Sequence, residues 1–283
     1  MEILHGLIGI LYFKMLLFLR QRKSMKLKLP NWGSLCNPNL LLNSDFRNGI
    51  INQQGKTSYL KGSNDWGKIY SIDMWAIQRG IQLSVNSNII SVECTNSNEP
   101  GYLLQKLDYV GKATAAINIK SITGSVSLNT AYGKYELLKK GLNIITYDFG
   151  FEQSDSWFSI RISEGSTVEI DFMKLEPGEH FTGMPIYNRA IELLKCQKKY
   201  VMLKDIKWTL KGHTSQTFSL SLLLPVDMEK TPSVTVVNTD SSFGIEDITA
   251  WSNGQVIQIA FKCLTDNMFD ARINRVEVDA YDY

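Results

Sequence analysis

Side chains that commonly carry out catalysis are sparse in this sequence. A nucleophilic Ser or Cys needs a base within reach, and the only histidines after residue 37 are His180 and His213, neither of them in a recognisable motif. There is no GxSxG, Walker A, HExxH or dinucleotide-binding pattern. The acidic residues show no arrangement that indicates a glycosidase pair. The sequence therefore predicts a protein that is not an enzyme.

Aromatic side chains offer a different chemistry, the binding of sugars. A flat ring stacks on the apolar face of a pyranose, while amides and acids bond to the hydroxyl groups. Rings in turn-rich stretches are better candidates than rings inside strands. Four rings meet this condition: Trp66 in KGSNDWGK, Tyr132 and Tyr135 in TAYGKYE, and Trp251 in TAWSNGQ, which we expect at a hairpin tip. The alternative for each is a ring that covers the core or makes an oligomer contact.

Length and charge limit the classes of protein that remain. The chain has 283 residues, which suits two domains. Hydrophobic residues at 44% and charged residues at 20% exclude wholesale disorder. Six basic residues lie within residues 1–28 and leave 24 basic and 27 acidic residues in the rest of the chain. A mildly acidic body without a basic stripe argues against a nucleic-acid partner.

The cysteines, Cys36, Cys94, Cys196 and Cys263, are widely separated, and no CxxC pair occurs. A zinc site would need ligands gathered from distant parts of the chain. We therefore expect four free and mostly buried thiols, as in a protein assembled in a reducing cytosol.

The first 29 residues begin with an apolar stretch at 3–19 (ILHGLIGILYFKMLLFL), followed by the basic RQRKSMKLKL. We expect an apolar helix here. Its charge follows the apolar run, unlike that of a signal peptide, and its length is at the lower limit for crossing a membrane. Three interpretations stay open: a single-pass anchor, a helix that packs against copies of itself, or an extension upstream of a start at Met25. The last two are favoured over the anchor.

Short runs that alternate between apolar and polar residues follow from Asn39 onward, and they indicate antiparallel sheets packed as a sandwich. Residues 187–201 (YNRAIELLKCQKKYV) predict the one convincing helix of the body, with Tyr187, Ala190, Ile191, Leu194 and Val201 on one face. Arg189, Glu192, Lys195 and Lys199 would face away. The predicted strands are 81–85, 89–93, 115–119, 125–128, 142–149, 157–162, 167–175, 218–224, 233–237, 255–261 and 275–281.

The predicted fold class is mainly β. We expect an N-terminal apolar and basic helix with its linker at residues 1–37 and a jelly-roll β-sandwich at 38–178. A loop and short linking α-helix would follow at 179–201, and a smaller C-terminal β-sandwich domain at 202–283. Within the jelly roll, Trp75 of YSIDMW would fill the core.

Several stretches together resemble a family of phage and prophage tail-fibre proteins. They are NLLLNSDFRNGIINQQGKTSY (39–59), YSIDMW (70–75), YLLQKL (102–107), IDFMKLEP (170–177), PIYNRAIELLKCQKKY (185–200) and LPVDMEKTPSVTVV (224–237). Each motif alone is weak, and their order and spacing are moderately specific. The sequence departs from the family pattern at CQKKY, which keeps one of two aromatics, and at Glu229, where a basic residue is usual.

The resemblance implies a carbohydrate-binding-module-like jelly roll in a homotrimeric receptor-binding protein of the virion. Such a protein is made in the bacterial cytoplasm, joins other tail proteins and attaches to a bacterial surface glycan. The resemblance also suggests that Asp45 and Asp171 hold part of a structural calcium site, although two acids supply few of the six to eight oxygens needed. The alternative places these acids at turns or in solvent. No other cofactor is expected.

Two other functions stay open. The chain could be a structural virion component, such as a fibre connector or decoration protein, that has no ligand of its own. It could also be a membrane-anchored bacterial lectin held by residues 3–19.

Overall fold

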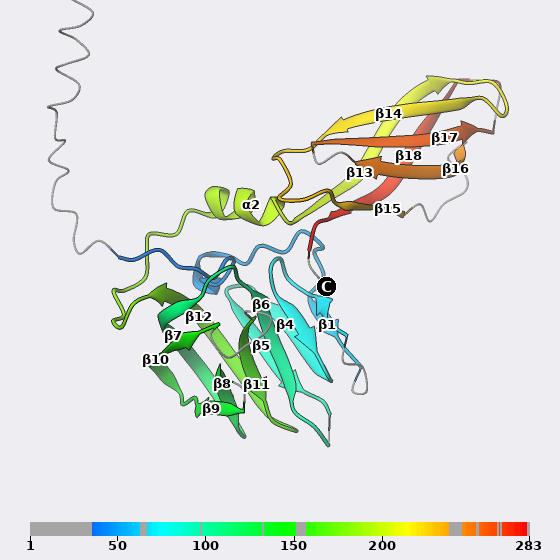
Figure 1. Cartoon of the computed structure of the whole chain (residues 1–283). Helices are drawn as coiled ribbons and strands as arrows, with labels where there is room; N and C mark the ends of the chain where they lie inside the picture. The colour runs from blue at the N-terminus through cyan, green and yellow to red at the C-terminus, as the bar shows by residue number, and fades with distance from the viewer. Residues whose placement is uncertain are drawn as a thin grey trace, which may run out of the picture. The chain divides into compact units, whose positions relative to one another are not determined.

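Four antiparallel sheets make up most of the chain in a computed structural model (Figure 1). The structure describes residues 36–62, 67–96, 98–131, 133–150, 157–237, 245–252, 255–264, 266 and 268–281. Within these residues the only α-helix is α2, and a single 3-10 turn, η1, spans Phe46–Asn48. The predicted mainly β class is confirmed. The predicted helix at 3–19 lies outside the described residues.

Two six-stranded sheets form a jelly-roll-like sandwich, and consecutive strands often alternate between them. One sheet has the order β1-β4-β5-β12-β7-β10, with strands β1 Ser58–Leu60, β4 Ile81–Asn86, β5 Ile89–Cys94, β7 Gly111–Thr123, β10 Gly141–Phe149 and β12 Thr167–Pro177. The other has the order β2-β3-β6-β11-β8-β9, with strands β2 Ile69–Tyr70, β3 Ala76–Gln78, β6 Gly101–Lys106, β8 Val126–Ala131, β9 Lys134–Leu137 and β11 Trp157–Ile162.

The core of this sandwich follows from the period of two along each strand, since every second side chain points to the same face. In β11, for example, Phe158, Ile160 and Ile162 are buried in the core. Trp75 is 0% exposed in the same core, and its ring packs edge-on against Phe158. The prediction that Trp75 fills the core is therefore confirmed.

Two three-stranded sheets follow in the C-terminal part of the chain and share a second apolar core. Their orders are β13-β18-β15 and β14-β17-β16. The strands are β13 Tyr200–Lys211, β14 Thr217–Leu223, β15 Ser233–Val237, β16 Ile245–Ser252, β17 Val256–Cys263 and β18 Met268–Asp279. Strands β13 and β16 were not predicted, and β13 begins at Tyr200, inside the range predicted as helix. The predicted domain limits stay a prediction, and residues 37–283 group as one compact unit.

Helix α2 spans Arg189–Gln197, and the side chain of Asn188 caps its N-terminus. The helix was predicted, but its buried face was predicted wrongly. Ile191 and Leu194 are 53% and 47% exposed. Glu192 turns inward instead, where its carboxylate accepts a hydrogen bond of 2.6 Å from the backbone of Asn43, and Cys196 is fully buried. The hydrogen bond from Asn43 to Glu192 thus places Glu192 on the buried face of α2, whereas hydrophobic periodicity alone predicted that Ile191 and Leu194 would be buried.

The remaining sequence expectations about the chain concern its thiols and its membrane-spanning potential. Cys94, Cys196 and Cys263 are free and buried, as predicted. Among the described residues, no helix is long and apolar enough to cross a membrane.

A buried ion pair fastens the loop after β12 to the sandwich. Lys174 and Glu176 are both 0% exposed, and their charged groups lie 2.9 Å apart. Lys174 also donates to the carbonyl oxygen of Gly183 at 2.6 Å, and Glu176 accepts from both the backbone and the hydroxyl of Thr182. Both buried charges are therefore paired and hydrogen-bonded, which is the condition under which a protein tolerates them.

We predict that Lys174→Met destabilises the protein by about 3 kcal/mol, because it leaves the Glu176 carboxylate buried without its cation. Urea unfolding of the purified chain measures this loss. The control is Lys112→Met, which breaks the exposed Lys112–Glu179 pair and should leave the free energy of unfolding nearly unchanged. Equal losses in the two variants would contradict the structural role of the buried pair.

Candidate functional site

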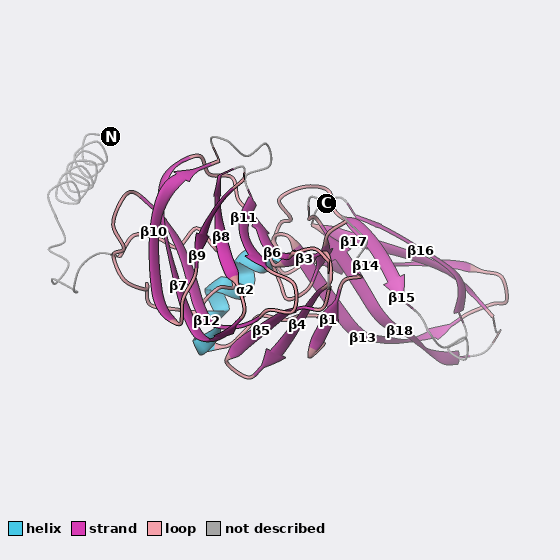
Figure 2. Ribbon diagram, turned by 90° about the horizontal axis from the view of Figure 1, so that it is seen from below, coloured by secondary structure: helices cyan, strands magenta, loops and turns pink. Residues whose placement is uncertain are grey.

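The outward face of the sheet β2-β3-β6-β11-β8-β9 carries a cluster of rings and polar groups. We call Tyr102, Asn129, Tyr135 and Arg161 the aromatic face. Their neighbours along the strands, such as Leu103, Leu128 and Ile160, point into the core, so the pleat directs these four side chains outward. Figure 2 shows the contributing strands side by side in the order β9, β8, β11 and β6.

The pairing register brings the four residues together. Arg161 on β11 is opposite Tyr102 on β6, and Asn129 on β8 is opposite Tyr135 on β9. The Arg161 guanidinium lies 5.0 Å from the centroid of the Tyr135 ring, a cation–π contact that holds the ring in place. Burial raises the pKa of Tyr102, and the neighbouring phenol of Tyr135 raises it further. The Tyr102 phenol therefore stays protonated and can donate a hydrogen bond at neutral pH.

Two features make this face suited to a polar ligand with an apolar side. Tyr135 is 42% exposed, so its ring is open to a partner. The side-chain oxygen of Asn129 is buried and has no hydrogen-bond partner among the described residues. An unpaired buried acceptor costs free energy unless a ligand or water supplies a donor. A sugar offers both hydroxyl donors and an apolar ring face.

The structure places the other predicted glycan-binding rings apart from this face or leaves them undescribed. Trp66 and Tyr132 lie outside the described residues. Trp251 is 52% exposed on β16, one residue before the end of the strand. Its neighbour across the sheet is Gln258, whose side chain bonds to Ser221. Trp251 therefore lies on a different sheet, β14-β17-β16, in the C-terminal part of the chain.

The two acids proposed for calcium have protein partners. Asp45 accepts two hydrogen bonds from the guanidinium of Arg47, at 2.8 and 2.9 Å, and one from Asn48. Asp171 accepts one from Asn118 at 2.9 Å. The part of the chain that the structure describes contains no group of three or more His, Cys, Asp or Glu that could hold a metal ion. The calcium site stays a prediction, and Asp45 serves the turn at η1.

The sequence prediction did not include Tyr102, Asn129 and Arg161, because these residues lie within strands and not in turns. A signal was present in the sequence. In YLLQKL and WFSIRI, Tyr102 and Arg161 alternate with residues that are plainly core-forming. Two neighbouring strands with outward Tyr and Arg predict a shared surface, but only the register shows that the two residues are directly opposite each other.

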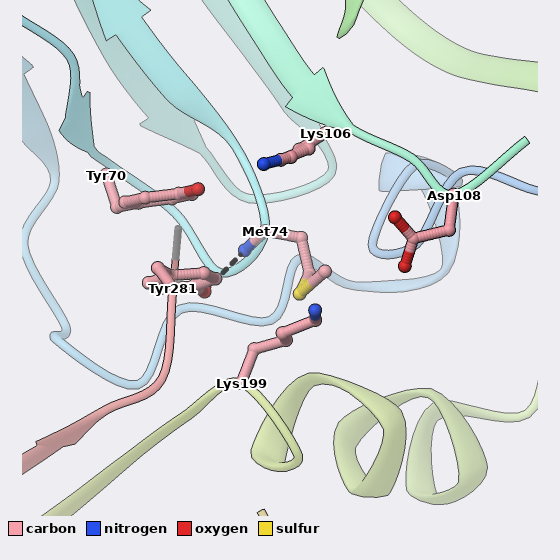
Figure 3. A pocket seen from close by; sticks show the side chains of 6 residues that line it. All are labelled: Tyr70, Met74, Lys106, Asp108, Lys199 and Tyr281. Atoms are coloured by element: carbon pink, nitrogen blue, oxygen red, sulfur yellow. Dashed lines mark hydrogen bonds between the residues drawn. The ribbon is translucent and has the colours of Figure 1, made fainter. Parts of the chain in front are cut away.

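A stack of three tyrosines joins the C-terminal residues to the first sandwich. The ring centroids of Tyr70 and Tyr281 lie 3.6 Å apart with the rings nearly parallel, and the Tyr200 ring also stacks on Tyr281, with its centroid 5.9 Å away. The Tyr281 hydroxyl accepts a hydrogen bond of 2.8 Å from the backbone of Met74 (Figure 3). Lys106, Asp108 and Lys199 surround a cavity of about 30 Å³ beside this stack, room for little more than a water molecule.

A second connection beside the stack is made of buried polar groups. The Asp73 carboxylate accepts hydrogen bonds from the backbone and the side chain of Gln53, at 3.0 and 2.6 Å. The same Gln53 amide donates to the carbonyl oxygen of Tyr200. Burial raises the pKa of Asp73 although these bonds lower it. A carboxyl whose pKa is raised by folding contributes stability at low pH, and that contribution is lost as pH rises from the unfolded-state pKa through the folded-state pKa.

Part of the chain is similar to solved structures of family 29 carbohydrate-binding modules. One mutant of CBM29-2 is 10% identical over 43% of this chain and 91% of that chain, with a TM-score of 0.27. A mutant complexed with cellulohexaose is 11% identical over 42% and 89%, with a TM-score of 0.26. Another mutant, complexed with mannohexaose, is 11% identical over 42% and 90%, with a TM-score of 0.25. These values are too low to transfer a site or a ligand. No protein-family model and no curated protein matches the chain.

We predict that Tyr281→Phe lowers the free energy of unfolding by about 1–3 kcal/mol, because the buried Met74 amide loses its acceptor while the ring stack is kept. Urea denaturation measures the change. Tyr135→Phe is the control, since it removes the same atom from an exposed ring, and it should leave stability unchanged. A stable Tyr281→Phe variant would mean that the hydrogen bond does not contribute to the stability of this part of the protein.

Proposed function

We propose that this chain is a receptor-binding protein of a phage tail and that its aromatic face binds a glycan of the bacterial surface. The observation that carries the proposal is the set of Tyr135, Arg161 and Tyr102 around the unpaired side-chain oxygen of Asn129. An exposed ring beside fixed donors and acceptors is the arrangement that sugar recognition needs. Glycan binding is non-catalytic in this proposal.

The placement in a phage tail is supported by the ordered motifs of the sequence, which resemble tail-fibre proteins. The proposal extends to the setting that such proteins have: assembly in the bacterial cytoplasm, incorporation into the virion with other tail proteins, and association into a homotrimer. Nucleic acid is not among the proposed partners.

We predict that Tyr135→Ala weakens binding to host-surface glycan about tenfold, or ~1.4 kcal/mol, because the only widely exposed ring of the aromatic face is lost. A glycan array prepared from bacterial envelope polysaccharides identifies the ligand, and calorimetry on that ligand measures the affinity. Arg161→Met should give a smaller loss, because it leaves the ring in place but without its cation.

Trp251→Ala is the matched control, since it removes an aromatic ring of similar exposure from another sheet. Its affinity should equal that of the unmodified protein. If Trp251→Ala loses binding and Tyr135→Ala does not, the ligand binds the C-terminal sheets and the proposed site is wrong. If no envelope glycan is retained by the unmodified chain, a structural virion component becomes the better explanation.

We predict that the purified chain has three times the protomer mass of 32.1 kDa in size-exclusion chromatography with light scattering. The comparison is a variant that begins at Met25, which separates an oligomer helix at residues 3–19 from assembly through the rest of the chain. A stable monomer for the full chain argues against the tail-fibre assignment. If the full chain is soluble only in detergent and the truncated variant is soluble without it, the membrane-anchored lectin is favoured instead.

A further inference from the structure

A cleft of about 420 Å³ opens beside the tyrosine stack, separate from the aromatic face. Its size lies within the range of about 300–1,000 Å³ that small-molecule sites occupy. The residues that line it come from β1 and the turn before it, from β2, and from the ends of β13 and β18. They include the charged residues Lys56, Lys68, Glu277 and Asp279 and the tyrosines Tyr70, Tyr200 and Tyr281. We call this the tyrosine cleft.

The acidic and the basic side chains of the tyrosine cleft differ in whether they have interaction partners. The Glu277 carboxylate lies 2.8 Å from the guanidinium of Arg275, and Asp279 accepts a hydrogen bond of 2.8 Å from the backbone of Tyr281. The two lysines have no carboxylate partner among the described residues. The Lys56 ammonium lies 5.8 Å from the Tyr59 ring, and the Lys68 ammonium lies 4.5 Å from the Trp157 ring. Lys56 and Lys68 are therefore the cations of the cleft for which the described residues provide no carboxylate partner.

The tyrosine cleft also contains a buried donor without a partner. Tyr200 is 4% exposed, and its hydroxyl has no hydrogen-bond partner among the described residues. Its pKa is raised by burial and by the nearby Glu277, so the phenol keeps its proton. A buried hydroxyl is normally satisfied, and one that is not is a position where a ligand acceptor would be favourable.

We propose that the tyrosine cleft is a second ligand site and that it binds an acidic saccharide, a sugar that carries a carboxylate or phosphate group. The anionic group lies between the Lys56 and Lys68 ammonium groups and accepts a hydrogen bond from the Tyr200 hydroxyl. The apolar face of the sugar lies against the tyrosine rings. The ligand class rests on the proposed glycan-binding function, whereas the site and its charge preference rest on the cleft itself.

The test uses the full chain and three probes: trigalacturonic acid, its methyl ester, and glucose 6-phosphate. The ester has the same shape without the charge. Calorimetry should show binding of the acid and at least tenfold weaker binding of the ester. Binding of glucose 6-phosphate but not of trigalacturonic acid assigns a phosphate-bearing sugar to the cleft. Failure of both anionic probes, or equal binding of acid and ester, overturns the proposal.

Variants then locate the site. The double variant Lys56→Gln with Lys68→Gln should lower the affinity for the acidic probe at least tenfold. The double variant Lys139→Gln with Lys140→Gln removes the same charge from an exposed turn and should leave the affinity unchanged. Tyr200→Phe should keep its stability, because its hydroxyl has no protein partner, and bind the probe several-fold more weakly. Tyr135→Ala should bind the probe unchanged. If only Tyr135→Ala loses binding of the probe, the probe binds the aromatic face and the proposal for the cleft is wrong. If Tyr135→Ala binds the probe unchanged, the two proposed sites are independent.

Discussion

The side chain of Asn43 is the constraint on which much of this structure depends. It is 1% exposed and bonds to both backbone groups of Ile51 and to the carbonyl oxygen of Asp73. The backbone carbonyl of Asn43 accepts from the indole of Trp75, and its N–H donates to Glu192 of α2. One residue thus links the turn at residues 43–51, the core tryptophan and the helix, at a positive φ of 49° that asparagine tolerates better than most residues.

This polar centre gives a structural role to several residues of the sequence motifs that resemble tail-fibre proteins. The NLLLNSDFRNG and YSIDMW stretches supply Asn43, Asp45, Asp73 and Trp75, and all four are buried. Their hydrogen bonds go to neighbouring backbone and side chains. These buried residues specify how the turns close on the sandwich, while other residues of the same motifs, such as Lys56, Tyr102 and Tyr200, belong to the two proposed ligand sites.

The sequence predicted the parts of the fold that periodicity controls. Alternation in WFSIRI and TVEIDFMKL predicted the strands β11 and β12, because the side chains that face the sandwich core are apolar. Short strands such as β2 and β9, with two and four residues, carry too little pattern to detect. The aromatic face depends on register between β6, β11, β8 and β9, and register is set by turns and bulges that a single sequence does not reveal.

The helix shows why apolar periodicity alone can assign the wrong face. Ile191 and Leu194 form the more apolar stripe, yet Cys196 and Glu192 point inward. Burying Ile191 and Leu194 would gain apolar contact area but would leave the buried Asn43 N–H without its acceptor, at a cost of about 1–3 kcal/mol. The short, half-exposed helix gains little from one more apolar contact, so the hydrogen bond to Glu192 determines which face of the helix is buried. The same balance sets apart Asn129 and Tyr200, because the side-chain oxygen of Asn129 and the hydroxyl of Tyr200 have no hydrogen-bond partner in the part of the chain that the structure describes.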